Sequence, residues 1–95
     1  MAKGRVSYYA QHLHGKRTAS GELFEADSLT GAHCTLPFGA SVRVTNLNNE
    51  KQVVVRINDR GPFRKGRIID ISPAAAQEIG IIRTGTAKVR IETLN

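Results

Sequence analysis

The chain has 95 residues, 40% of them apolar, and a formal net charge of +6. This length predicts a single domain over residues 1–95, with one core and no second lobe, so any site should lie in a surface groove. No apolar run is long enough to cross a membrane, and a single cysteine excludes an internal disulfide.

The positive charge narrows the class of partner, because a basic surface favours an anionic ligand. Nucleic acid is one such ligand. However, the 14 lysines and arginines are scattered along the chain, with no basic helix and no aromatic RNA-binding signature. An anionic cell-wall polymer fits the charge equally well. The three histidines and Cys34 lack the paired spacing of zinc ligands, so we expect neither a metal nor a cofactor.

The first residues, Met-Ala-Lys-Gly at positions 1–4, contain no hydrophobic signal region. The protein is therefore either intracellular or a piece from which a targeting segment has been removed, and the start Met-Ala-Lys favours the second. We expect residues 1–4 to be disordered or an added segment.

Five segments have the alternation or composition of strands. In chain order they are Arg5–Ala10, Ser41–Asn46, Gln52–Asp59, Arg67–Ser72 and Thr86–Leu94. The stretch between the first two begins with Gln11–Glu22, which is almost free of apolar residues and predicts a long surface loop. The asparagine-rich segment Leu47–Lys51 predicts a hairpin turn.

A short helix is predicted after the fourth strand. Ser72 suits its N-cap, Pro73 its first position and Gly80 its end. At least five short strands with one or two helical turns exclude a helical bundle and a βαβ repeat. A small closed barrel is the natural solution, because closure leaves no exposed sheet edge in a short chain.

The segment VVVRINDRGPF, residues 53–63, carries a strand directly into an Asp-Arg-Gly-Pro turn. Asp, Gly and Pro are common in turns for backbone reasons alone. The alternative is that Asp59 is a catalytic carboxylate held rigidly at a strand end. The residues by themselves leave both interpretations open.

Eight acidic residues are few enough to compare one by one. Five are expected to be solvated charges: Glu25, Asp27, Glu50, Glu78 and Glu92. Asp70 lies opposite two buried isoleucines and could pair with an arginine or cap the helix. Glu22 and Asp59 remain, each at a place where a scaffold positions a group without burying it. Two carboxylates at a groove are the minimum set for cleaving a glycosidic bond.

The most specific signal is a set of four segments that follow one another in the chain: HGKRTASGE, LTGAHCTLPFGASVRVTNL, VVVRINDRGPF and GRIIDISPAAAQEIG. In this order and spacing the chain resembles the rare lipoprotein A family, bacterial septal-ring lytic transglycosylase domains, over about residues 6–94. More distantly it is similar to the first domain of expansins, to barwin-like proteins and to family-45 endoglucanases.

The resemblance implies an all-β fold with one or two short helices, a six-stranded double-psi β-barrel with a shallow groove. It implies that Asp59 is the general acid, that Glu22 is the second acidic residue, and that His33 is a polar group in the same groove. Further residues implied to contact the sugar are Tyr9, His14, Thr18, Ser20, Asn58 and Arg60.

The implied substrate is the glycan strand of peptidoglycan, especially strands stripped of stem peptides, and the implied product is a 1,6-anhydro-muramic end. The same resemblance implies a location in the periplasm or cell envelope. We expect a monomer, and the scattered basic residues lead us to expect no nucleic-acid partner. An expansin-like module that binds polysaccharide without cutting it shares the fold and remains the alternative.

The implied mechanism places demands on the groove. Asp59 must be neutral at the start, which partial burial or the negative charge of Glu22 would favour. The Arg60 cation should therefore point away from Asp59, toward a substrate carboxylate or a backbone carbonyl. His33 could instead serve structurally, by a hydrogen bond to a loop carbonyl. The lone Cys34 is expected to be buried.

Overall fold

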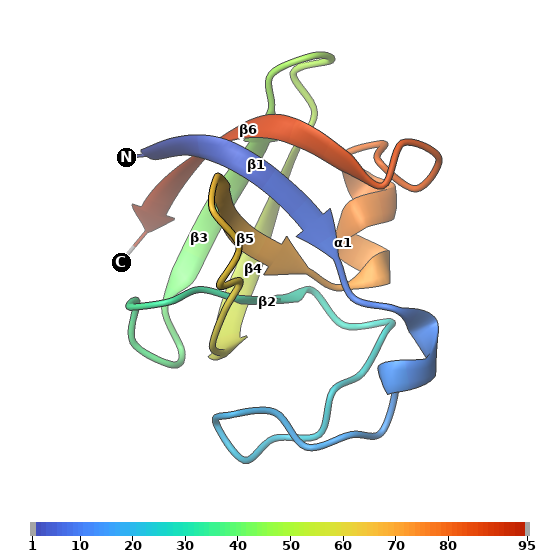
Figure 1. The fold of residues 1–95 in the computed structure, drawn as a ribbon, viewed down its shortest axis with the longest axis vertical. Coiled ribbons are helices and arrows are strands. Elements are labelled where there is room, and N and C mark those ends of the chain that lie inside the picture. The colour runs from blue at the N-terminus through green and yellow to red at the C-terminus, as the bar shows by residue number, and fades with distance from the viewer. Residues whose placement is uncertain (1, 95) are drawn as a thin grey trace.

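The computed structural model describes residues 2–94, which form a closed barrel of six strands with one short α-helix beside it (Figure 1). The elements in chain order are β1 (Ala2–Tyr8), a 3-10 helix η1 (Gln11–Leu13), β2 (Thr30–Ala32), β3 (Ser41–Asn46), β4 (Gln52–Asp59), β5 (Arg67–Ile71), α1 (Pro73–Glu78) and β6 (Thr86–Leu94). The prediction of a small closed barrel is confirmed.

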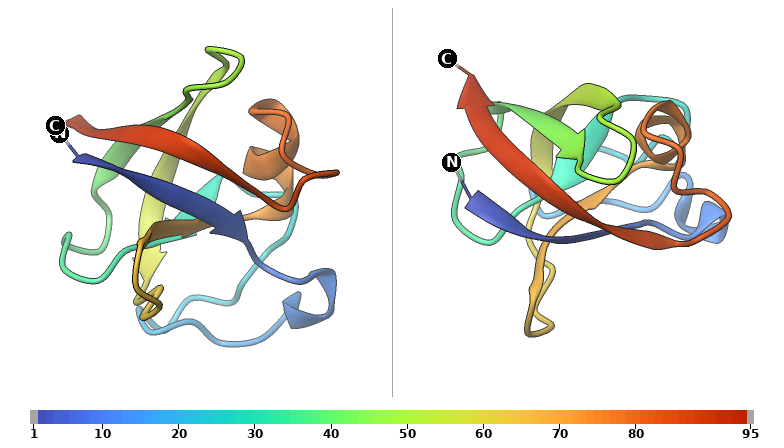
Figure 2. Two further views of the ribbon diagram at one scale, coloured as in Figure 1. Left: turned by 45° about the horizontal axis from the view of Figure 1, so that its top comes forward. Right: turned by 90° about the horizontal axis from the view of Figure 1, so that it is seen from above.

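The strand order around the barrel is β1-β5-β2-β4-β3-β6. The neighbours β1 and β5 are parallel, as are β2 and β4, while the other pairs are antiparallel. The start of β1 and the end of β6 pair at the same end of the barrel (Figure 2). Strands distant in sequence thus lie side by side, and this mixed order brings the ends of β1 and β4 toward one another.

The core consists of the inward-facing aliphatic side chains of the strands. Alternation along β3 and β6 buries Val42, Val44, Val89 and Ile91. Ile57 of β4 and Ile69 and Ile71 of β5 join them with no exposed surface, and α1 adds its buried alanines. Burial of branched aliphatic residues on one face of each strand is what the period of two produces.

Two predictions about the strands need correction. Of the two alternatives given for residues 1–4, disorder is wrong for Ala2–Gly4, which form the start of β1 and pair with β6; residue 1 lies outside the described residues. The strand β2 was not predicted, because three residues are too few to show alternation. Gly31 in β2 lies so close to β5 that a Cβ there would sit 3.0 Å from the carbonyl oxygen of Asp70.

The helix α1 begins and ends as predicted. Ser72 is its N-cap, where the side chain accepts a hydrogen bond from the amide of Ala75, and Pro73 is its first residue. Gly80 follows the helix with a φ of +73°, a conformation that glycine adopts without strain.

The segment between β1 and β2, residues 9–29, is called the long loop below. It contains the predicted loop Gln11–Glu22, and it includes η1. Figure 1 shows it extending beside the barrel toward the end of β4. Two of its amides fix it there, since Ser20 donates to the carbonyl of Asn58 and Ala19 donates to the side chain of Asp59.

Candidate active site

An open hollow of about 490 Å³ lies where β1 and β4 end. Its walls are the end of β1 with the first residues of the long loop, Asp59 at the end of β4 with residues 60–64 after it, and Arg67 and Asp70 of β5. Aromatic rings, two carboxylates and arginines therefore face a single concave surface. Such a combination suits a polar ligand with flat apolar faces, such as a sugar.

Asp59 is fixed at the edge of this hollow by three hydrogen bonds. Its Oδ1 accepts from the backbone amides of Ala19 at 2.8 Å and Arg60 at 2.9 Å, and its Oδ2 accepts from the hydroxyl of Tyr9 at 2.6 Å. The chain then turns at Gly61, whose φ of +121° is open to glycine alone. The Asp-Arg-Gly-Pro sequence is thus a turn, and that turn holds a carboxylate in place.

Tyr9 connects Asp59 to the long loop. Its ring stacks on Phe24 with centroids 4.6 Å apart, and its hydroxyl donates to Asp59. Burial raises the pKa of the Tyr9 hydroxyl above its ordinary range, and the hydrogen bond to Asp59 and the negative charges of Asp59 and Asp70 raise it further. Tyr9 is therefore protonated at neutral pH and can donate to Asp59.

A second carboxylate, Asp70, lines the hollow, and our elimination of acidic residues did not select it. In the sheet, Ala32 pairs with Asp59 on one side and with Asp70 on the other. Two strand spacings separate the aspartates, roughly 10 Å between Cα atoms. Asp70 accepts a hydrogen bond from the hydroxyl of Ser7, its partner on β1, and not from an arginine or the helix.

Glu22 is paired with Arg56 and does not line the hollow that contains Asp59. Its carboxylate accepts two hydrogen bonds from Arg56, at 2.7 and 2.8 Å, and a longer one from Asn58. These hydrogen bonds, the pair from Arg56 first, hold the pKa of Glu22 below its ordinary value. Because Asn58 directly precedes Asp59, Glu22 is placed to steady the strand end that carries Asp59.

Two of the predicted sugar-binding residues, Thr18 and Ser20, build the loop above Asp59. Their hydroxyls lie 2.9 Å apart, and the Thr18 hydroxyl donates to the carbonyl of Glu22. Another, His14, uses Nδ1 to accept the amide of Ala26. These three side chains hold the long loop together and do not line the hollow.

Arg60 points away from Asp59, as the implied mechanism required. Its guanidinium donates to the carbonyls of His33 and Leu36, and it lies 4.0 Å from the centroid of the Phe38 ring. The expectation that this side chain reaches a backbone carbonyl is confirmed. The Nη1 group of Arg60 therefore makes its hydrogen bonds to the protein's own backbone.

His33 is placed differently from its predicted role. Its Nδ1 accepts hydrogen bonds from the amides of Thr35 and Leu36, and the ring borders a separate hollow near the start of β1 and the end of β6. Partial burial lowers the pKa of His33, and the charge of Arg60 lowers it further. The expected hydrogen bond to a loop carbonyl is not found among the described contacts, and the ring instead has a structural role in which it accepts from two amides.

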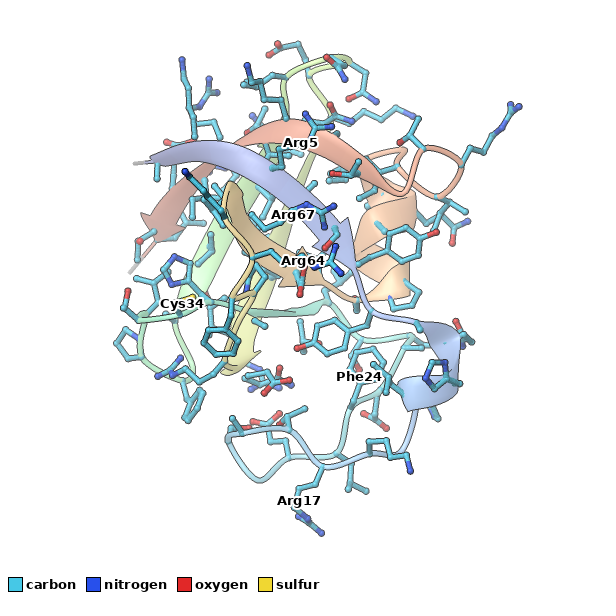
Figure 3. The ribbon with its side chains drawn as sticks, in the orientation of Figure 1. Arg5, Arg17, Phe24, Cys34, Arg64 and Arg67 are labelled. Atoms are coloured by element: carbon cyan, nitrogen blue, oxygen red, sulfur yellow. The ribbon has the colours of Figure 1, made fainter. Side chains whose placement is uncertain are left out.

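The expectation that Cys34 is buried is wrong. Cys34 is exposed, and its Sγ lies 3.0 Å from the carbonyl oxygen of Pro62 (Figure 3). It directly follows His33 after the short strand β2, where the chain has left the barrel for the surface. Among residues 2–94, no group of three His, Cys, Asp or Glu side chains could hold a metal ion, and no helix is long and apolar enough to span a membrane.

Comparison with solved structures identifies the fold class as a double-psi β-barrel. The expansin of Clavibacter michiganensis has a TM-score of 0.77 at 19% sequence identity, with 98% of this chain and 50% of that chain covered. At such identity the likeness concerns the fold alone.

Comparison of sequences then gives the family. Residues 1–91 match the lytic transglycolase domain family, and the chain belongs to it. A Vibrio cholerae protein named endolytic peptidoglycan transglycosylase RlpA is 53% identical over 91 residues, covering 96% of this chain and 35% of the relative. A Synechocystis protein named as a probable enzyme of the same kind is 55% identical over 89 residues, covering 94% and 28%. The predicted resemblance is confirmed, and the chain spans about a third of the length of these curated relatives.

Proposed function

We propose that this domain cleaves the glycan strands of peptidoglycan as a lytic transglycosylase, acting best on strands without stem peptides. The observation that carries the proposal is Asp59, a carboxylate fixed by three hydrogen bonds at the edge of an open, aromatic-lined hollow. Membership of the lytic transglycolase family and the names of the relatives support it. The domain would work as a monomer in the bacterial cell envelope.

The reaction needs one group that first gives and then takes a proton. Protonated Asp59 donates to the bridging oxygen as the bond from that oxygen to the muramic C1 breaks. The C6 hydroxyl of the same sugar then attacks C1, and Asp59 accepts the hydroxyl proton. The product is a 1,6-anhydro ring, no water is consumed, and Asp59 returns to its starting state.

The other polar groups serve this cycle in different ways. Tyr9 keeps its proton and donates to Asp59 Oδ2, which leaves the carboxylate oriented when its own proton has been given up. Asp70 supplies a second negative charge in the hollow and can stabilise the positive charge that develops at C1. Glu22 acts through Arg56 and Asn58 as a positioning residue.

A non-catalytic, expansin-like binding module is the second candidate, supported by the closeness of this fold to an expansin. The two functions differ in their products. Purified peptide-free glycan strands should be incubated with the domain, and the fragments analysed by mass. A transglycosylase gives ends that are one water lighter than those made by a hydrolase on the same strands. Intact strands that are nevertheless bound would favour the binding module, and hydrolytic ends would contradict the anhydro mechanism.

A further inference from the structure

Three basic side chains lie in register across neighbouring strands on the outside of the barrel. Arg5 of β1 pairs with Arg67 of β5 on one side and with Lys88 of β6 on the other. We call these three residues the cationic row. Arg5 and Lys88 are exposed and Arg67 is half-buried, and the row spans roughly 10 Å across two strand spacings. Figure 3 shows Arg5 and Arg67 on the same face, with Arg64 next to them.

This arrangement opposes stability, because like charges directly opposite on neighbouring strands repel one another. Within residues 2–94, no side chain of the cationic row forms an ion pair or a side-chain hydrogen bond. A contrasting case lies nearby on β6, where Arg90 is paired with Glu92 at 3.9 Å. The cationic row thus presents three unneutralised charges to solvent, which suits an external anion.

The cationic row is continuous with the hollow that contains Asp59. Arg67 belongs to both, and Arg64 lines the hollow beside it. Beyond a register shift after Arg5 and the buried Val6–Ile69 pair, β1 and β5 continue with the Ser7–Asp70 pair, which also lines the hollow. A ligand that leaves the hollow along β1 therefore passes over the three cations.

A ligand that occupies both the hollow and the cationic row should combine flat apolar faces with anionic groups. Tyr8, Tyr9 and Phe63 line the hollow, and the Phe63 ring is 84% exposed, which suits sugar rings. Nucleic acid fits less well, because Asp59 and Asp70 would face its phosphates in the same hollow. A peptide-free glycan strand carries a free lactyl carboxylate on every second sugar, and a stem peptide would convert that carboxylate to an amide.

We infer that the cationic row binds the lactyl carboxylates of peptide-free muramic residues, on the part of the strand that extends from the hollow along β1. This rests on the proposed function and adds a reason for the strand preference, because the charge is lost whenever a peptide is attached. Arginine can contact a carboxylate through two parallel hydrogen bonds, which fixes the strand as well as attracting it.

The test compares binding of two ligands by two variants. The ligands are peptide-free strands and the same strands with their carboxylates converted to neutral amides. The row variant is Arg5→Gln with Lys88→Gln, and the matched control is Lys51→Gln with Arg83→Gln, an equal charge change at exposed positions outside the cationic row. The row variant should bind the free-acid strands at least about tenfold more weakly than the parent, since hydrogen bonds to charged groups are strong.

The same variant should bind the amidated strands as the parent does, and the control should resemble the parent on both ligands. The row variant should unfold at the same temperature as the parent or higher, because repulsion is relieved, so weaker binding cannot be attributed to misfolding. Equal binding of free-acid strands by parent and row variant would overturn the inference. An equal loss on amidated strands, or on unrelated duplex DNA, would also overturn it, since the cationic row would then be unselective.

These outcomes separate the inference from the proposed function. If the parent forms anhydro products and the row variant binds free-acid strands as the parent does, only the inference is contradicted. If the cationic row is needed to bind free-acid strands but no anhydro product forms, the proposed transglycosylase function is contradicted and the inferred carboxylate site is supported.

Discussion

The barrel and the long loop are held together by different forces. The barrel strands bury aliphatic side chains, among them Ile57, Ile69 and Ile71 with no exposed surface. The long loop buries few side chains, namely Thr18, Phe24 and Ala26. Its shape depends on individual polar contacts, such as the amide of Ala26 donating to His14. Stabilisation by burial is the sum of many small contacts, so it depends little on any one of them. A single hydrogen bond depends on one donor and one acceptor and is removed by one substitution.

This difference separates stability from function within one small domain. Asp59 lies where the two regions meet. It is the last residue of β4, and its side chain accepts a hydrogen bond from the amide of Ala19 in the long loop. The barrel sets where Asp59 is, and the long loop sets how its carboxylate is oriented. Changes in the two regions should therefore have different consequences, and three substitutions test this, while a fourth tests the turn that follows β2.

The largest expected effect is on cleavage, from Asp59→Asn. Asparagine nearly preserves the shape of the side chain but has no carboxyl proton to transfer. The rate of anhydro-product formation should fall by about 10²–10⁴-fold, while strand binding and the free energy of unfolding change little. The control is Asp27→Asn, the same chemical change on an exposed part of the long loop, which should keep the parent rate. A variant Asp59→Asn that forms product near the parent rate would show that another group is the acid.

The next effect is on stability, from Ile69→Ala in β5. Removing a fully buried side chain leaves a cavity, which should lower the free energy of unfolding by about 2–5 kcal/mol. Val54→Ala changes an exposed residue of β4 and should lower the free energy of unfolding by under about 1 kcal/mol. Both are measured by denaturant unfolding. Similar costs for the two variants would contradict the view that burial holds the barrel.

The same division explains which features could be predicted from the sequence. Alternation is a local property, so β3, β4 and β6 were predicted with the bounds that the structure has, and the helix was predicted from Ser72 and Gly80. The closed barrel followed because a short chain with this many strands has few ways to cover its edges.

The arrangement of the site depends on contacts between distant parts of the chain, which local pattern does not contain. Asp70 enters the hollow because Ala32 lies between it and Asp59, a consequence of strand order. Glu22 is paired with Arg56, which is 34 positions away. The resemblance indicated Asp59, but it could not indicate that Arg56 neutralises Glu22 or that Cys34 is exposed.

A smaller effect is expected from His14→Ala, which removes one contact that shapes the long loop. The amide of Ala26 loses its acceptor, at a cost of about 1 kcal/mol. Hydrogen exchange should accelerate at Ala26 and neighbouring loop amides, while amides of β4 and β6 keep the parent rates. His12→Ala is the matched control, because His12 is exposed and accepts no such hydrogen bond among the described contacts. Equal acceleration in the barrel would mean that the two regions unfold as one unit.

The smallest effect concerns pH and the turn that follows β2. Neutral His33 accepts two amides through Nδ1, and its pKa is lowered by partial burial and by Arg60. The unfolded chain therefore binds a proton at His33 at a higher pH than the folded chain does. The stabilisation from neutral His33 is complete above the unfolded value of about 6.5, and it is lost as the pH falls from there through the lower folded value. Because water screens this half-exposed ring, the change should be under about 1 kcal/mol.

The substitution His33→Asn isolates this contribution. An asparagine oxygen can accept the amide two residues later, so the turn is kept, but the side chain no longer titrates. Unfolding free energies of parent and variant should be compared at pH 7.5 and pH 5. The parent should lose more stability than the variant over this interval, since all other groups titrate alike in both. An equal loss would mean that His33 carries its proton in the folded protein as readily as in the unfolded chain, and the polar contacts around Arg60 would then tolerate a second positive charge.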